Sequence, residues 1–145
     1  MIKDIYPYLN IKDNLVFGFL SEGNKGIIYK IVIFTLTKEG KWNLAFGDWQ
    51  NNSLNDKVMT NNQDIVRVIG TVAHLTYVFF SHYPDAIVVI DPVDEKRKKL
   101  YNIVFQRHYT TISSDFDILG LTGRQSEVYS PNKVYGSFEL SLKSK

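Results

Sequence analysis

Three side chains in the stretch DEKRKKLYNIVFQRHY, residues 94–109, are of types that could do chemistry together. Arg97, Tyr101 and His108 are four and seven residues apart, so a helix through this stretch places them on one face. An arginine binds phosphate or carboxylate, and a tyrosine and a histidine can act as acid and base. The spacing therefore indicates one side of a pocket for an anionic ligand.

The same spacing also has a structural interpretation. An arginine on an apolar helix face needs an anion, because an unpaired buried charge is very unfavourable. Asp94 or Glu95 would supply that anion, and His108 would then hydrogen-bond inside the core. In both interpretations Arg97 points inward, whereas Lys98, rotated by about 100° on the helical wheel, is expected to face solvent.

A second predicted helix, from about residue 62 to 82, carries two further candidates for binding. Its apolar stripe runs from Ile65 to Tyr83, and the opposite face, with Arg67 and His74, is small and polar. Small residues allow close approach, so this face is a candidate for meeting a partner chain or a ligand. A plain solvated helix face remains the alternative.

The elements that must position these residues follow from the hydrophobic pattern. Strand-like runs and turns fill the first third of the chain, and the helix of residues 62–82, a short apolar strand, the helix of about residues 94–112 and two more strands follow. We predict an α+β fold with a mixed, largely antiparallel sheet in the order βββαβαββ and two helices packed on it. The expected strands are LVFGFL, GIIYKIVIFTLT, KWNLAFG, AIVVID, FDILGL and VYGSFELSLK.

Length and composition bound the remaining possibilities. The 145 residues predict a single domain, 1–145, and the formal net charge of +2 does not indicate a nucleic-acid binder. Without cysteine or clustered ligands we expect no metal, and without a cofactor motif we expect no cofactor. The charged N-terminus and the short apolar runs predict a cytoplasmic protein that does not enter a membrane.

Five short motifs in the chain resemble those of one protein family. They are YPY (residues 6–8), SEG (21–23), NLAFGD (43–48), TNNQD (60–64) and KRKKLY (96–101). In this order and at these distances they resemble an uncharacterised family of small bacterial proteins, catalogued only as a domain of unknown function. The resemblance implies a bacterial, cytoplasmic origin and supplies no mechanism.

Two functional hypotheses remain, and they leave open whether the protein is an enzyme. The first is a non-catalytic protein-interaction module, for instance half of a toxin–antitoxin-like two-gene system, that binds a partner encoded by a neighbouring gene. It would use a sheet edge or the face around His74. The second is a metal-independent RNA-acting toxin in which Arg and Lys hold phosphate while Tyr101 and His108 act as acid and base. The low net charge favours the first.

Overall fold

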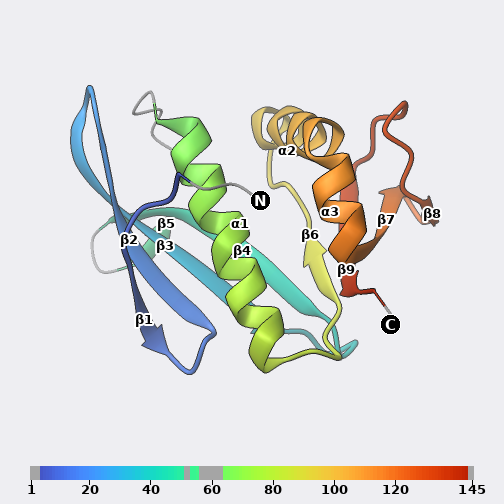
Figure 1. The fold of residues 1–145 in the computed structure, drawn as a ribbon, viewed down its shortest axis with the longest axis horizontal. Coiled ribbons are helices and arrows are strands. Elements are labelled where there is room, and N and C mark those ends of the chain that lie inside the picture. Colours follow the sequence, from blue (N-terminus) through green and yellow to red (C-terminus); the bar gives the residue numbers. More distant parts are fainter. Residues whose placement is uncertain (1–3, 51–52, 56–63, 144–145) are drawn as a thin grey trace. The chain divides into compact units, whose positions relative to one another are not determined.

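The computed structural model of the protein describes residues 4–50, 53–55 and 64–143, which form two compact units (Figure 1). The first unit comprises Met1–Thr35 and Ala45–Tyr83, and the second comprises Leu36–Leu44 and Pro84–Lys145. Residues 36–44, between two segments of the first unit, therefore belong to the second unit together with the C-terminal part of the chain. That the two fold together as a single domain stays a prediction.

Twelve elements are found in the described residues. Those up to residue 83 are β1 (Tyr8–Lys12), β2 (Val16–Gly23), β3 (Gly26–Leu36), β4 (Trp42–Gln50), β5 (Ser53–Asn55) and α1 (Ile65–His82). Those that follow are β6 (Val88–Ile90), α2 (Glu95–Arg107), α3 (Tyr109–Asp115), β7 (Phe116–Thr122), β8 (Gln125–Val128) and β9 (Ser137–Leu142).

The strands of the first unit lie in the order β1-β2-β3-β4, with β5 paired to β4. Two tight turns close its first hairpins. Asp13 and Asn14 have φ of 50° and 61°, as the favoured two-residue hairpin turn requires, and the Leu15 N–H donates to Lys12 O across them. The next turn ends in the cross-strand pair Gly23–Gly26.

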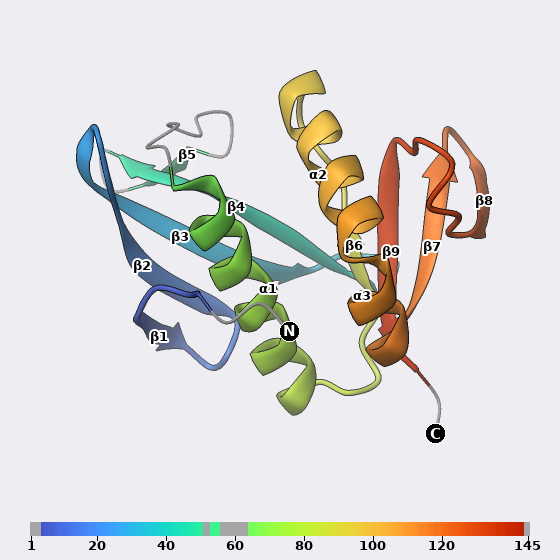
Figure 2. The ribbon, with the colours of Figure 1, turned by 45° about the horizontal axis from the view of Figure 1, so that its top comes forward.

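Helix α1 covers one face of these strands (Figure 2), and the Phe79 ring stacks on Phe34 of β3 with centroids 4.2 Å apart. The predicted stripe is largely buried, but Ile65 is exposed, while Thr71 and Leu75, outside the stripe, are buried. By length and composition α1 could also cross a membrane. Half of it is buried in the protein, and core helices of soluble proteins meet the same test.

A buried ion pair lies within the same unit. Lys30 of β3 and Asp48 of β4 are 1% and 0% exposed, and Lys30 Nζ lies 2.6 Å from Asp48 Oδ1. Lys30 stands opposite Phe19 in the register, so it shares a face of the sheet with the apolar residues that pack towards α1. A charge at this depth is tolerated only because its counter-charge is buried beside it.

The second unit includes the first residues of β4. Trp42 and Asn43 pair in parallel with Val88 and Val89 of β6, and antiparallel pairs then follow in the order β6-β9-β7-β8. Strands β6 and β7 correspond to the expected strands AIVVID and FDILGL. Strands β6 and β7 run in the same direction, since both are antiparallel to β9, but β9 lies between them.

Helices α2 and α3 pack on the strands of the second unit, where the rings of Phe105 and Phe138 stack with centroids 4.2 Å apart (Figure 1). The Asn102 side chain fixes α2 to the segment before β9: its Nδ2 donates to Tyr135 O, and its Oδ1 accepts from Tyr135 N. A buried amide with both ends satisfied in this way sets the position of the helix.

The predicted α+β class with a mixed, mostly antiparallel sheet is confirmed. Three short strands were missed, β1, β5 and β8, because their residues alternate weakly or are exposed throughout. The single helix expected over residues 94–112 is two helices, since the backbone changes direction at His108 with φ −106° and ψ 19°. The expected start of α1 at residues 60–63 lies outside the described residues.

Candidate functional site

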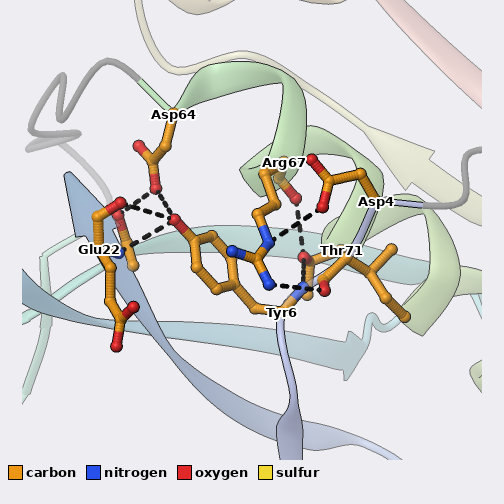
Figure 3. Close-up of polar contacts among 8 residues, drawn as sticks. Asp4, Tyr6, Glu22, Asp64, Arg67 and Thr71 are labelled. Atoms are coloured by element: carbon orange, nitrogen blue, oxygen red, sulfur yellow. Dashed lines mark hydrogen bonds and ion pairs between the residues drawn. The ribbon is translucent and has the colours of Figure 1, made fainter.

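Four of the five quoted motifs contribute to the first unit, and three of them meet around Tyr6 (Figure 3). The Tyr6 hydroxyl lies 2.5 Å from Asp64 Oδ2, and it also hydrogen-bonds the backbone O and N–H of Glu22 at 2.9 and 3.0 Å. Ser21, beside Glu22, donates to the same Asp64 oxygen. YPY, SEG and the last residue of TNNQD thus form one hydrogen-bonded cluster, which we call the Tyr6 cluster: Tyr6, Ser21, Glu22, Asp64, Arg67 and Thr71.

Asp64 is the residue before α1, yet its side chain makes no capping hydrogen bond to the helix. Instead it accepts hydrogen bonds from Tyr6 and Ser21, which come from segments 58 and 43 residues away. Burial and the adjacent Asp64 carboxylate raise the pKa of the Tyr6 hydroxyl above its ordinary value. Tyr6 therefore stays protonated at neutral pH, and it holds the segments together as a hydrogen-bond donor.

Arg67 lies over the Tyr6 ring with its Cζ 4.1 Å from the ring centroid. Its Nη2 donates to Ile5 O at 3.3 Å, and its Nε lies 3.2 Å from Asp4 Oδ1 without the geometry of a hydrogen bond. Phe19 stacks with the same tyrosine, with centroids 5.7 Å apart. The guanidinium is therefore held over an aromatic ring that is itself fixed.

Thr71, one turn further along α1, completes the attachment of the N-terminal segment. Its Oγ1 accepts from Tyr6 N at 2.9 Å and donates to Arg67 O at 2.7 Å. Residues 4–6 are consequently fastened to the first two turns of α1 through both backbone and side chains, as the dashed lines in Figure 3 show.

A cavity of about 490 Å³ opens beside the Tyr6 cluster. Gly18 forms part of its wall, and the Tyr29 side chain crosses the strand at this position. Only glycine allows that crossing, because a Cβ at residue 18 would lie 2.6 Å from the Tyr29 hydroxyl. The lining is mainly apolar, with Arg67 and Glu22 as its charged members. The full set is Tyr6, Pro7, Tyr8, Leu9, Gly18, Phe19, Leu20, Glu22, Tyr29 and Arg67.

The sheet face turned away from α1 carries large exposed apolar side chains around this cavity. Leu9, Leu20 and Ile27 are 67%, 49% and 68% exposed. The strand register places them on one face, because Leu9 pairs with Gly18, two residues from Leu20, and Ile27 pairs with Glu22. A group of exposed apolar residues beside a cavity is typical of a binding surface.

On its outer edge β1 pairs with no other strand of the described residues. The N–H and C=O groups of successive residues in a strand point alternately to its two sides. The N–H and C=O of Glu22 both bond the Tyr6 hydroxyl, which shows that they point to the side of β2 on which β1 lies. The groups of Gly18 therefore point the same way, and those of its partner Leu9 point inward to β2.

It follows that the N–H and C=O groups of Tyr8 and Asn10 point outward from the sheet. Within the described residues none of these four groups has a hydrogen bond, and β1 is the last strand on its side. The pattern is that of an edge strand open to a further strand.

His74, a predicted binding residue, lies under β1, where its ring is 5.5 Å from that of Tyr8. This contact and the Arg67–Tyr6 stack both involve the small polar face of α1. The N-terminal segment of the chain itself, residues 4–8, lies against it. The structure therefore places Arg67 beside the cavity and His74 behind its wall.

Arg97, the other predicted binding residue, is 3% exposed. Its Nη1 lies 2.9 Å from Asp94 Oδ2, while Asp94 Oδ1 accepts from the Arg97 N–H at 2.8 Å as the N-cap of α2. Nε and Nη2 of Arg97 are buried and have no hydrogen-bond partner among the described residues. The inward orientation predicted for Arg97 is found, whereas Lys98 is only half-exposed.

The two acid–base candidates differ in their surroundings. Burial raises the pKa of Tyr101 to about 12, although the positive charge of Arg97 opposes the shift. His108 ends α2 and begins α3, and its backbone bonds Val104 O and Ile112 N. The helix on which Arg97, Tyr101 and His108 were expected to share one face therefore ends before His108.

Metal chemistry has no evident site in the part of the chain that the structure describes, since no three His, Asp or Glu side chains there gather to hold an ion. A smaller cavity, of about 300 Å³, lies in the second unit between α2 and the loop before β9. Its lining includes two exposed cations, Lys99 and Lys133, and the latter is paired with Glu127 at 3.0 Å.

Sequence reasoning had missed Tyr6, Glu22 and Asp64 as members of a site. Only the motifs YPY, SEG and TNNQD pointed to these positions, and short motifs do not reveal which of them meet in space. A family model matches residues 3–143, almost the whole chain, and that family is described as Family of unknown function (DUF6934). No curated protein and no solved structure matches the chain.

Proposed function

This chain belongs to the Family of unknown function (DUF6934), and we propose that it is a non-catalytic protein-interaction module that binds an extended segment of a partner protein along β1. The observation that carries the proposal is the open outer edge of β1 beside the 490 Å³ cavity. Strand addition of this kind takes its affinity from backbone hydrogen bonds and its specificity from pockets for alternate side chains.

The exposed apolar residues strengthen this proposal. Long, exposed apolar edge strands promote aggregation unless they are protected or used for binding. Leu9 and Ile11 of β1, 67% and 49% exposed, lie on such an edge. A partner strand would cover them and would also supply hydrogen bonds to Tyr8 and Asn10.

Catalysis receives less support from the same geometry. The hydroxyls of Tyr6 and Ser21 are buried and donate to a carboxylate, so neither is positioned to attack a substrate. In the RNA-acting alternative, the buried Arg97 would have to leave its ion pair with Asp94 to reach phosphate, and Tyr101, with a pKa of about 12, is a weak acid at neutral pH. No observation favours that alternative.

The identity of the partner and its location extend the proposal. A cytoplasmic, bacterial setting and a partner encoded by a neighbouring gene, as in a toxin–antitoxin-like pair, are part of what we propose. An extended, flexible segment of such a partner could add to the edge of β1 without any change in the fold of either chain.

A peptide-display selection tests the proposal. Random dodecapeptides selected on the protein should be enriched in sequences that alternate apolar and polar residues, because only one face of an added strand meets the apolar surface. Leu9→Lys should abolish the enrichment. Val128→Lys, a change at an even more exposed valine of β8, should leave it intact.

Hydrogen exchange then locates the bound peptide. On addition of an enriched peptide, the amides of Tyr8 and Asn10 should become protected, while that of Leu9, which faces β2, should change little. The absence of any enriched peptide, or enrichment that survives Leu9→Lys, would contradict the proposal.

A further inference from the structure

Resting on the proposed function, we infer that Arg67 is the receptor for a carboxylate carried by the bound segment, so that the partner strand bears an acidic side chain next to an apolar one. The cavity beside β1 supplies both environments. Its lining is mainly apolar, and Arg67 is its cation.

The guanidinium of Arg67 is fixed in place before any ligand arrives. It lies 4.1 Å over the Tyr6 ring, which also stacks with Phe19 and is held at its hydroxyl by Asp64. A planar donor group that is already immobilised loses little freedom on binding a carboxylate. Arg67 therefore meets the requirement of a specificity-determining residue.

The hydrogen-bonding capacity of Arg67 is only partly used. Nη2 donates to Ile5 O at 3.3 Å, and Nε has no hydrogen bond among the described residues although Asp4 Oδ1 lies 3.2 Å away. Nη1 has no partner within the described part of the chain. A guanidinium offers five donors, so most of the fork remains open to a carboxylate.

Asp4 marks the position that a ligand carboxylate would take. Its side chain is 72% exposed and belongs to the first described residue of the chain, so its ion pair contributes little to stability. A carboxylate on a partner strand held along β1 can therefore displace it. Glu22, the acidic member of the lining, directs its carboxylate away from the Tyr6–Arg67 stack in Figure 3.

Charge complementarity thus argues for an acidic peptide. Nucleic acid binds through many phosphate contacts, whereas the lining of this cavity offers the single cation Arg67 and the chain has a net charge of only +2. A second copy of the chain could also use the β1 edge, and this possibility is one outcome of the test.

The experiment measures binding of one enriched, fluorescently labelled peptide and of its twin in which each Asp or Glu is replaced by Asn or Gln. We expect the acidic peptide to bind the wild-type protein at least about tenfold more tightly than its neutral twin, as a charge-assisted bidentate pair would give. Arg67→Gln should remove this preference, and Arg67→Lys should restore only part of it.

Asp4→Asn provides a change in the opposite direction. Removing the competing carboxylate should tighten binding of the acidic peptide by about two- to fivefold, which corresponds to an exposed ion pair. Arg124→Gln, at an exposed arginine in the turn between β7 and β8, is the matched control and should leave the preference for the acidic peptide unchanged. Thermal melting of each variant shows that its fold is retained.

Four outcomes would overturn the inference. If enriched peptides lack acidic residues, or if Arg67→Gln keeps the preference, the carboxylate receptor is wrong while binding at β1 stands. If the protein forms a dimer that Leu9→Lys dissociates, the edge is occupied by a second copy. If no peptide is enriched, the proposed function itself fails, and the carboxylate receptor fails with it.

Discussion

The two long helices begin with the same local pattern, an aspartate followed three residues later by an arginine. The aspartate and the arginine contact each other in α2, whereas in α1 each of them contacts other residues. In α2, Asp94 caps the helix and pairs with Arg97. In α1, Asp64 leaves the helix uncapped and binds Tyr6 and Ser21, while Arg67 turns to Asp4, Ile5 and the Tyr6 ring.

The difference shows when tertiary contacts override a local preference. An aspartate at this position commonly caps its helix, and it does so in α2, where its second carboxylate oxygen accepts from Arg97 Nη1 of the same helix. At α1 two hydroxyl donors from distant segments compete for the carboxylate and take it. The arginine that loses its local partner becomes half-exposed and lines a cavity, whereas the arginine that keeps it is buried.

The largest expected effect comes from neutralising the local pair in α2. Asp94→Asn should lower the free energy of unfolding by about 3 kcal/mol, because Arg97 is 3% exposed and loses its counter-charge. Asparagine is also a good N-cap, so the loss reports the charge. Denaturant unfolding measures it, with the exposed neighbour Glu95→Gln as the control. A loss below about 1 kcal/mol would show that the buried arginine does not need Asp94.

The tyrosine beside Arg97 gives a pH-dependent test of similar size. Its folded pKa, about 12, lies above the ordinary value of 10, so its contribution to stability is complete below pH 10 and is lost as the pH rises towards 12. The loss should reach about 2–3 kcal/mol over two pH units. Tyr101→Phe should remove this part of the alkaline decline. If both proteins lose stability in parallel above pH 10, the hydroxyl of Tyr101 is not protected by burial.

Breaking the tertiary contacts of Asp64 should have an intermediate effect. Asp64→Asn weakens the hydrogen bonds from Tyr6 and Ser21 and should lower the free energy of unfolding by about 2 kcal/mol. Because these bonds fasten the N-terminal segment, the Tyr6 amide should exchange faster even where global stability is retained. Unchanged exchange at Tyr6 would show that the Thr71 contact alone holds the segment.

The smallest effect on stability is expected at the partner of Arg67. Asp4→Asn should change the free energy of unfolding by less than about 0.5 kcal/mol, since Asp4 is 72% exposed and the pair is open to solvent. Thermal melting at low and high salt should therefore superimpose for this variant and the wild type. A loss comparable with that of Asp94→Asn would remove the contrast between the two arginines.

Much of the fold was determined locally by the sequence. The 3.6-residue period predicted α1 and most of its buried stripe, and runs of β-branched and aromatic residues predicted β2, β3 and β4. The helical wheel of residues 94–112 correctly predicted that Arg97 points inward. The side of a helix on which a residue lies follows from its position relative to the apolar residues of the same helix. The family resemblance was likewise carried by local motifs and is confirmed.

The candidate site, by contrast, was decided by tertiary structure. Tyr6 and Asp64 are 58 residues apart, and Lys30 and Asp48 are 18 apart. No periodicity within one element indicates which carboxylate a distant hydroxyl or ammonium will meet, because register and strand order bring them together. The same reason explains why β9 between β6 and β7, and the open edge of β1, were found only in the folded chain.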